Sequence, residues 1–504
     1  MHSPFNMIDW IVFFSYFLIL ILTSVIFSKT KVNTSREYFT GGNSVPMWAV
    51  AISVLATSQS AATFLGGPEY SFNKDLTFIG FYLSAFLAVI FVAKVLVPRF
   101  YAIKAITVYE YLEYRYSPKA KQYAGIMFLV GRLFASGARL YIGALAISMI
   151  LFFDIEPLHI AISIGILIMG ALAYTYFGGV KSVIFSDVIQ AITYIGAGVA
   201  VLVYIYYTSN TDFSTIINIL DNENKLKIVD FSFSGGFSFW TLLTGWLLLN
   251  IAAYGLDQDM TQRVLSCKNK KEGEKSLIYS IIFTIPVAIL FLFIGLLLYI
   301  YYTHPEISGI KEACIDRKFQ GNDITIFMFY ILNEMPNGFK GLVTVGAIAA
   351  ALSSTNSVLS AMASVAVEDI YKPWFASNIK DEKYFLKVSR IMVVVFAVLL
   401  SIMAMISYYW QQYTNLPLLN FALGIMAFAY ASLLGVYGAG IFTNRGNEKT
   451  VLFALIGGFL TVLILQPYIF PTKVDFSIQI ILGTAVSFMI MMLDNKIEFL
   501  YKKA

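Results

Sequence analysis

The chain has 504 residues, of which 58% are hydrophobic and only 13% are charged. A soluble domain carries about 25% charged residues, so this composition excludes an ordinary soluble protein. Many apolar runs of 18 residues or more indicate an all-α polytopic membrane protein, because backbone groups in lipid must find hydrogen-bond partners within their own helix. The net charge of +5 excludes little by itself. We expect the lipid bilayer and a small solute as partners, and no nucleic acid.

Thirteen apolar segments are long enough to cross a membrane as helices. They are residues 7–28, 46–72, 76–98, 122–152, 157–177, 182–208, 237–262, 276–303, 338–367, 386–409, 416–442, 450–470 and 474–493. The first run is too long for the apolar core of a signal peptide, so we expect it to remain as a span.

The distribution of basic residues predicts the orientation of these spans. With the N-terminus outside, most of the 35 Lys and Arg residues fall in segments on the inner side. This is the asymmetry that the positive-inside rule requires. We therefore predict thirteen spans, an outer N-terminus and an inner C-terminus, with a short outer helix within residues 321–341.

The whole chain is predicted to form one transporter domain. Its parts are a leading helix (7–28), a first group of five spans (46–208), a second group of five (237–442) and two C-terminal helices (450–493). Because five is odd, the two groups run through the membrane in opposite directions. That arrangement permits an inverted repeat, which is a common plan of transporters.

The second span carries polar residues at its centre, in "AISVLATSQSAATFLGGPEYSF". The polar residues are Thr57, Ser58, Gln59, Ser60 and Thr63, and Gly66, Gly67 and Pro68 follow them. This pattern is typical of a discontinuous helix, whose freed carbonyl groups can coordinate a cation or a solute. The alternative is hydrogen bonding between helices by small residues.

The ninth span contains five polar residues in succession, in "AAALSSTNSVLS" (349–360). Ala350, Ser353, Ser354 and Ser357 share one broad helix face, because residues three and four apart lie above one another. Hydroxyl and carbonyl oxygens suit a hard cation, and sodium suits them better than magnesium, which demands octahedral geometry and retains its water. The alternative is close helix packing by Ser and Ala.

Asp187, Arg132 and Arg139 lie inside predicted spans, where charged residues are costly and usually functional. Asp187 lies roughly 9 Å deeper than Lys181 at the inner surface, and it could attract a cation or pair with a nearby base. Arg132 and Arg139 are seven residues apart on one face of the fourth span. A buried guanidinium could bind a solute carboxylate bidentately, and it could equally pair with an acidic side chain.

The seventh span places Asn250 and Tyr254 deep within the membrane. The residues that follow, Asp257 to Arg263, are interpreted as a network at the inner surface. The three histidines lie at loops or span edges, which argues against a histidine proton relay.

Four stretches resemble the sodium/solute symporter family, which includes bacterial sodium-sialic-acid, sodium-galactose and sodium-proline symporters. They are "REYFTGGNSVPMWAVAISVLAT", "YFGGVKSVIFSDVIQ", "DQDMTQR" and "AAALSSTNSVLSAMASVAVEDIY". The resemblance covers roughly residues 6–442. It implies an inverted-repeat fold of the leucine-transporter type, with a discontinuous first helix in each repeat.

The resemblance also implies ligands for sodium. The main site would use the carbonyl groups of Ala56, Gln59 and Ala350 with the hydroxyl groups of Ser353 and Ser354. The sialic-acid branch has a second site, whose positions here are Asp187, Ser353, Asn356 and Ser357. Asn356 stands where that branch has a serine, which leaves one or two sodium ions open.

Solute contacts carry over from different branches. Ser60, Thr63 and Phe78 match the sialic-acid branch, and Asn250 matches the galactose branch. The arginine that receives the sialic-acid carboxylate aligns with Ala135, with Arg132 and Arg139 one turn to either side. Arg139 therefore favours an acidic solute, with Arg132 and Tyr254 as further candidate contacts.

We predict a sodium-coupled symporter, not an enzyme, that imports a sugar or a sugar acid such as sialic acid by alternating access. It would act as a monomer in the plasma membrane, the inner membrane of a bacterium. A monocarboxylate or an amino acid is the alternative solute. A transporter-like membrane sensor is the alternative class, against which the absence of a cytoplasmic domain argues.

Overall fold

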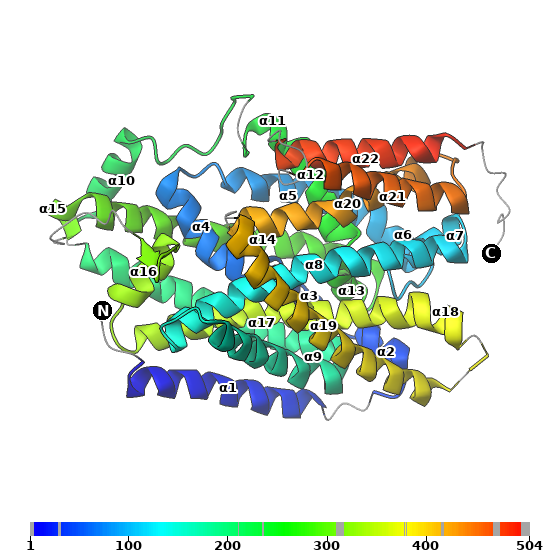
Figure 1. Ribbon diagram of the computed structural model, residues 1–504, viewed down its shortest axis with the longest axis horizontal. Coiled ribbons are helices and arrows are strands. Elements are labelled where there is room, and N and C mark those ends of the chain that lie inside the picture. Colours follow the sequence, from blue (N-terminus) through cyan, green and yellow to red (C-terminus); the bar gives the residue numbers. More distant parts are fainter. Residues whose placement is uncertain are drawn as a thin grey trace.

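The computed structural model is an elongated bundle whose long helices run mainly along its longest axis (Figure 1). It describes residues 5–28, 32–209, 211–233, 236–308, 317–376, 378–379, 381–414, 418–466 and 474–494. Short helices gather at the two ends, with α10, α15 and α16 at the left of Figure 1 and α7 and α18 at the right. The bundle is therefore organised along an axis that can cross a membrane.

The elements follow one another in a regular order along the chain. The first half holds α1 (Met7–Ser28), α2 (Ser35–Thr40), η1 (Gly41–Asn43), α3 (Met47–Ser58), α4 (Ala61–Asn73), α5 (Ile79–Phe91), the π-helix η2 (Val92–Leu96), α6 (Val97–Ala102), α7 (Glu110–Arg115), α8 (Pro118–Leu151), α9 (Pro157–Thr208) and α10 (Phe213–Asn222). The second half holds α11 (Phe239–Leu242), α12 (Gly245–Gly255), α13 (Gln258–Val264), α14 (Lys270–Thr303), α15 (Pro305–Ser308), β1 (Lys318–Phe319), β2 (Asn322–Asp323), α16 (Ile326–Asn333), α17 (Phe339–Val365), the π-helix η3 (Ala366–Tyr371), α18 (Lys372–Phe375), α19 (Glu382–Thr414), α20 (Leu418–Phe442), α21 (Glu448–Ile464) and α22 (Phe476–Met492).

Several helices are long and apolar enough to cross a membrane. Among the described residues there are six, or up to eight if each of two bent helix pairs counts as one span. Large apolar side chains such as Phe14, Met169, Ile192 and Val398 are exposed on the outside of the bundle. Such an exposed apolar surface suits contact with lipid.

The predicted break in the second segment separates α3 from α4. Gln59 and Ser60 have extended backbone angles, and the two helix axes meet at 59°. The N–H of Ser60 would bond Ala56 O in an unbroken helix, but it donates to Thr63 Oγ1 at 2.8 Å. Thr63 thereby stabilises the start of α4 and leaves the carbonyl of Ala56 without its helical partner.

A second break lies between α12 and α13, which bend by 55°. The Asp257 carboxylate accepts a hydrogen bond from the N–H of Asp259 at 3.0 Å and so caps the start of α13. A bend thus falls in the first segment of each group of five, as the resemblance implies.

Helix α9 is a hairpin of two helical halves joined at Gly179. A straight helix of 52 residues would be about 78 Å long, far more than the roughly 30 Å of a bilayer core. Thr175 and Ser186 both contact Asn356, at 3.4 Å each, although eleven residues of straight helix would separate them by about 16 Å. The chain therefore reverses at Gly179, between the predicted segments 157–177 and 182–208.

Helix α17 forms the buried centre of the bundle. Almost all of its side chains are buried, and it packs against α1, α8, α9 and α19. Small residues allow this close approach, as where Gly143 of α8 faces the Ala351 side chain. The five polar residues of the ninth segment thus lie within protein and away from lipid.

The short helix predicted within residues 321–341 is confirmed as α16. It follows the β1–β2 hairpin at the left end of Figure 1. Glu69 of α4 accepts hydrogen bonds from Arg317 at 2.9 Å and from the Ile326 N–H at 2.6 Å. These contacts fasten this end region to the second half of the broken helix.

Replacing Gly179 with alanine is expected to destabilise the fold by about 2 kcal/mol or more. Gly179 has a φ of 58°, and an added Cβ would lie 2.3 Å from Tyr38 O. The measurement is thermal unfolding in detergent, with Gly165→Ala as the control because nothing lies within 4 Å of its Cβ position. Equal stability of the two variants would contradict the reversal at Gly179.

Candidate functional site

The break between α3 and α4 meets the polar run of α17. Ser354 Oγ lies 3.2 Å from Gln59 O and 3.3 Å from Ala350 O, so a single hydroxyl connects the two helices. The carbonyl of Ala56, one turn before the break, has lost its helical donor. These neutral oxygens from two helices have the chemistry that a hard monovalent cation requires.

Ser353 points away from this cluster toward Asp187. Its hydroxyl donates to Asp187 Oδ1 at 2.9 Å, and Ser53 Oγ donates to Asp187 Oδ2 at 2.5 Å. Both Asp187 and Ser353 are buried. The structure thus brings Ser354, Gln59 and Ala350 together, while Ser353 joins a neighbouring cluster around the carboxylate.

Arg263 is the cation that faces Asp187. Its Nη2 lies 3.1 Å from Asp187 Oδ2, and the same nitrogen contacts Ser357 Oγ. The sequence interpretation placed Arg263 in a network at the inner surface, but the residue is fully buried. The signal that could have revealed it is the spacing of four residues from Asp259, with which it pairs at 3.1 Å.

Asn356 contacts α9 on another side of α17. Its Nδ2 donates to Ser186 Oγ at 3.4 Å, and its buried Oδ1 has no hydrogen-bond partner. Among the predicted ligands of a second sodium, Asp187 and Ser357 contact Arg263, and Ser353 contacts Asp187. Asn356 does not contact that carboxylate.

Arg132 is held by acidic side chains, which is one of the two alternatives that the sequence left open. Its guanidinium pairs with Asp257 at 2.9 Å and with Asp259, and it donates to Tyr430 Oη at 3.3 Å. Asp259 also pairs with Arg263, so the two arginines share one carboxylate. The charge network of Arg132, Asp257, Asp259, Arg263 and Asp187 thus holds three acidic and two basic groups, all buried.

A small cavity lies beside the oxygen cluster formed by Ser354 Oγ, Gln59 O and Ala350 O. Its volume is about 10 Å³, room for about one water molecule, and it lies between α4, α8, α17 and α19. It is lined by Ser60, Ala61, Ser136, Arg139, Leu140, Ala351, Ser354, Thr355, Val358 and Leu400. Two predicted solute contacts, Ser60 and Arg139, therefore share one space with Ser354.

The other predicted solute contacts lie elsewhere. Thr63 caps α4, and Phe78 packs in an aromatic cluster against Phe81 and Phe237. Asn250 Nδ2 lies 3.5 Å from Phe81 O, so Asn250 and Phe78 flank the same turn of α5. Tyr254 is buried on α12, and within the described part of the chain none of these four residues lines the small cavity.

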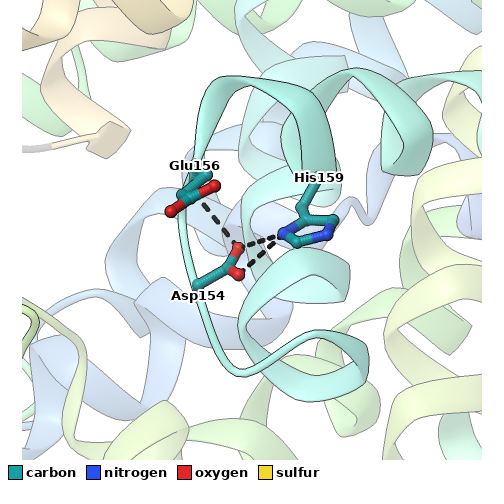
Figure 2. Close-up of side chains that lie close together, drawn as sticks. All are labelled: Asp154, Glu156 and His159. Carbon is teal, nitrogen blue, oxygen red and sulfur yellow. Dashed lines mark hydrogen bonds and ion pairs between the residues drawn. The ribbon is translucent and has the colours of Figure 1, made fainter.

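A further polar cluster lies in the turn between α8 and α9. Figure 2 shows Asp154 facing the ring of His159, whose Nδ1 is 2.7 Å from both carboxylate oxygens, with Glu156 nearby. The Glu156 N–H donates to the same carboxylate at 3.2 Å, and the His159 ring stacks on Phe152. These contacts shape the turn, far in sequence from the discontinuous helices.

Two interrupted helices and neutral oxygens facing a buried centre are typical of an ion-coupled membrane transporter. A model of the sodium:solute symporter family matches residues 38–458. The chain belongs to this family.

Individual proteins agree with this assignment. The chain is 29% identical to the sodium/sialic acid symporter SiaT of Proteus mirabilis (strain HI4320) over 91% of this chain and 89% of that protein. It is 28% identical to human sodium-coupled monocarboxylate transporter 1 over 84% of this chain and 67% of that protein.

A solved structure of a Na⁺-coupled sialic acid symporter, in a substrate-bound outward-open state, superimposes with a TM-score of 0.82. The two chains are 25% identical, and the match covers 97% of this chain and 98% of the other. The chain is thus a multi-pass, sodium-coupled symporter of the plasma membrane and not an enzyme, as predicted.

Removing one partner of the buried charge network is expected to lower the stability of the fold. Arg132→Gln leaves Asp257 without its guanidinium and should lower stability by about 3–5 kcal/mol. The double variant Arg132→Gln/Asp257→Asn should recover part of this loss, because it buries neutral amides instead. Thermal unfolding of the purified proteins measures both effects, and a single variant as stable as the parent would contradict the pairing.

Proposed function

We propose that the chain imports a sugar acid, with sialic acid as the leading candidate, together with sodium. The observation that carries this proposal is that Arg139 lines the same cavity as Ser60 and Ser354. A guanidinium beside hydroxyl groups is suited to a carboxylate with neighbouring hydroxyls. The similarity to sialic acid symporters in sequence and in structure supports this choice.

The main sodium site would use Ala56, Gln59, Ala350, Ser353 and Ser354. The freed Ala56 carbonyl and the contacts of Ser354 with Gln59 O and Ala350 O support this set. Ser353 would have to exchange its hydrogen bond with Asp187 for the ion. Sodium binding would then hold α17 against the break in the second segment.

A second sodium would bind at Asp187, Ser353, Asn356 and Ser357. The Asp187 carboxylate, beside the Ser53 and Ser353 hydroxyl groups, offers oxygen ligands of the kind that a hard cation prefers. Against it, Arg263 already contacts Asp187 and Ser357, so this site would form only when Arg263 shifts. We therefore propose that occupancy of this site depends on Arg263.

The solute pocket would be larger than the present cavity and would include Ser60, Thr63, Phe78, Arg139 and Asn250, with Tyr254 at its margin. Phe78 and Asn250 both flank the turn of α5 at Phe81, which supports their acting together. Arg132 would contribute through its ion pairs and not through the solute. The pocket must open before a sugar acid enters.

We propose thirteen spans of a leucine-transporter type, with an outer N-terminus and an inner C-terminus. The hairpin form of α9, the two bent segments and the further apolar helices α1, α20, α21 and α22 support this number. The first repeat would be residues 46–208 and the second 237–442, flanked by the helix at 7–28 and the two helices at 450–493. The protein would function as a monomer in the inner membrane of a bacterium.

Import would proceed by alternating access. At ~100 mV one inward charge is worth about 2.3 kcal/mol, and a tenfold sodium gradient adds about 1.4 kcal/mol. Together they could concentrate a neutral solute roughly 500-fold. A singly charged acid moving with one sodium loses the voltage contribution, so an acidic solute benefits from a second ion.

A solute screen tests the proposed substrate. Thermal unfolding in detergent is followed with sialic acid, neutral sugars, short monocarboxylates and amino acids, each with sodium or with potassium. We expect the largest stabilisation with sialic acid in sodium, since a ligand that binds only the native state raises its stability. A larger effect from a monocarboxylate such as lactate would favour the alternative solute class, to which Arg139 is equally suited.

Replacing Ser354 with alanine tests the main sodium site. The variant should need about tenfold or more sodium for half-maximal uptake in proteoliposomes, because it loses an oxygen that contacts a charged ion. Ser360→Ala, on the same helix and with no hydrogen bond to lose, is the matched control. Unchanged sodium dependence of the Ser354 variant would contradict the assignment.

A further inference from the structure

A groove opens at the end of the bundle where α7 lies, at the right of Figure 1. Its volume is about 320 Å³, within the range of about 300–1,000 Å³ that is usual for small-ligand pockets. None of its lining residues belongs to the sodium or solute sites described above. They come from the end of α20, the turn that follows it and the end of α22, and are Ile441, Phe442, Thr443, Asn444, Arg445 and Met492.

The groove combines apolar and basic groups at the end of an apolar helix. Phe442 is the last residue of α20, and its side chain is 68% exposed. The centroid of its ring lies 6.3 Å from that of Phe91 on α5. Asn444 and Arg445 follow directly and are also exposed. Basic side chains at the end of a membrane helix lie at the level of the lipid headgroups, so the groove opens at the boundary between lipid and water.

Arg445 is held at the groove by two hydrogen bonds. Its Nη1 donates to Met492 O at 2.9 Å, which fixes the guanidinium against the end of α22. Its backbone N–H donates to Thr443 Oγ1 at 3.2 Å, so the turn that carries the arginine is itself shaped by a hydrogen bond. A guanidinium has five N–H donors in a planar fork that matches phosphate. Arg445 can therefore keep the contact with Met492 and still bind an anion.

A second arginine, from a distant part of the chain, supports the same turn. Arg115 of α7 donates to Gly440 O at 3.2 Å and to Thr443 O at 2.8 Å. Lys119, at the start of α8, pairs with Glu448 at 3.2 Å. Two of the basic segments that the sequence analysis assigned to the inner side therefore meet at the groove.

The charge around the groove is positive. Two acidic groups are nearby: Glu448, which pairs with Lys119, and Asp494, two residues after Met492. Four basic groups face this pair of acids, so the local excess of positive charge attracts an anion. The basic groups are Arg115, Lys119, Arg445 and Lys449.

We propose that this groove binds the phosphate of an anionic phospholipid such as phosphatidylglycerol, with Arg445 as the phosphate ligand. The exposed Asn444 amide is a further donor, and the acyl chains lie against Phe442. Basic pockets between membrane helices suit such lipids, because the phosphate supplies the charge and the chains supply the apolar contact. With the orientation proposed above, the lipid belongs to the inner leaflet.

A phospholipid in the groove connects separate parts of the fold. The turn after α20 and the end of α22 both line it, and Arg115 joins that turn to α7. Because the lipid binds this native arrangement, it should stabilise the folded protein. Such binding requires neither sodium nor a solute, so it is independent of the transport activity proposed above.

The test is native mass spectrometry of the purified full-length protein, titrated with dioleoyl phosphatidylglycerol. Dioleoyl phosphatidylcholine has the same chains without net charge, and glycerol 3-phosphate has the phosphate without the chains. We expect phosphatidylglycerol to bind about tenfold or more tightly than either compound. Equal binding of the two lipids would overturn the proposal. Equally tight binding of glycerol 3-phosphate would also overturn it, because the occupant would then be a free phosphate ester.

Replacing Arg445 isolates the phosphate ligand. Arg445→Gln should weaken the binding of phosphatidylglycerol about tenfold and leave phosphatidylcholine unaffected, because it removes charged donors. Lys387→Gln is the matched control, since it removes the same charge from an exposed side chain of α19, which does not line the groove. The control should weaken binding less than about twofold. Equal effects of both substitutions would mean attraction by overall charge alone and would overturn the site.

Replacing Phe442 provides a second test if Arg445→Gln does not fold. Phe442→Ala alters an exposed side chain and so leaves no cavity in the core. It should weaken the binding of phosphatidylglycerol about threefold or more, because the acyl chains lose an apolar contact. Phe453→Ala on α21 is the control, since Phe453 is 60% exposed and does not line the groove. An affinity of the Phe442 variant equal to that of the control would overturn the proposal.

Discussion

The hydrogen bond from the N–H of Ser60 to Thr63 Oγ1 is the interaction on which the rest of the site depends. In a continuous helix that N–H would bond Ala56 O, and the second segment would cross the bundle with no free oxygen. Because Thr63 Oγ1 accepts this hydrogen bond, the Ser60 N–H keeps a partner where α3 ends and α4 begins inside the protein. The carbonyl groups at the break become available, and Ser354 of α17 contacts one of them.

The buried charge network has a different physical role. Five charged side chains from α8, α9, α13 and the loop before α13 lie within the bundle, where isolated charges would be very costly. They are tolerated because Arg132 and Arg263 each face two carboxylates and share Asp259. The network connects the helix break at Asp257 with Asp187, which accepts hydrogen bonds from Ser53 of α3 and Ser353 of α17.

The cavity beside Ser354 is smaller than any sugar, so in this conformation it has no room for a solute of that size. Ser60, Arg139 and Ser354 already face one another, while Phe78 and Asn250 lie around Phe81.

Composition and local pattern by themselves determined the membrane class, the break in the second segment, the oxygen-rich face of α17 and the reversal between residues 177 and 182. Each depends on residues close together in the chain, such as Thr63 three residues after Ser60. Only the tertiary structure decided that Arg132 pairs with Asp257 and Asp259, that Arg263 reaches Asp187, and that Ser136 opens on the same space as Ser354. Those contacts join α8, α9, α13 and α17, and the rotation of each helix about its axis is set by packing across the whole bundle, which no single segment encodes.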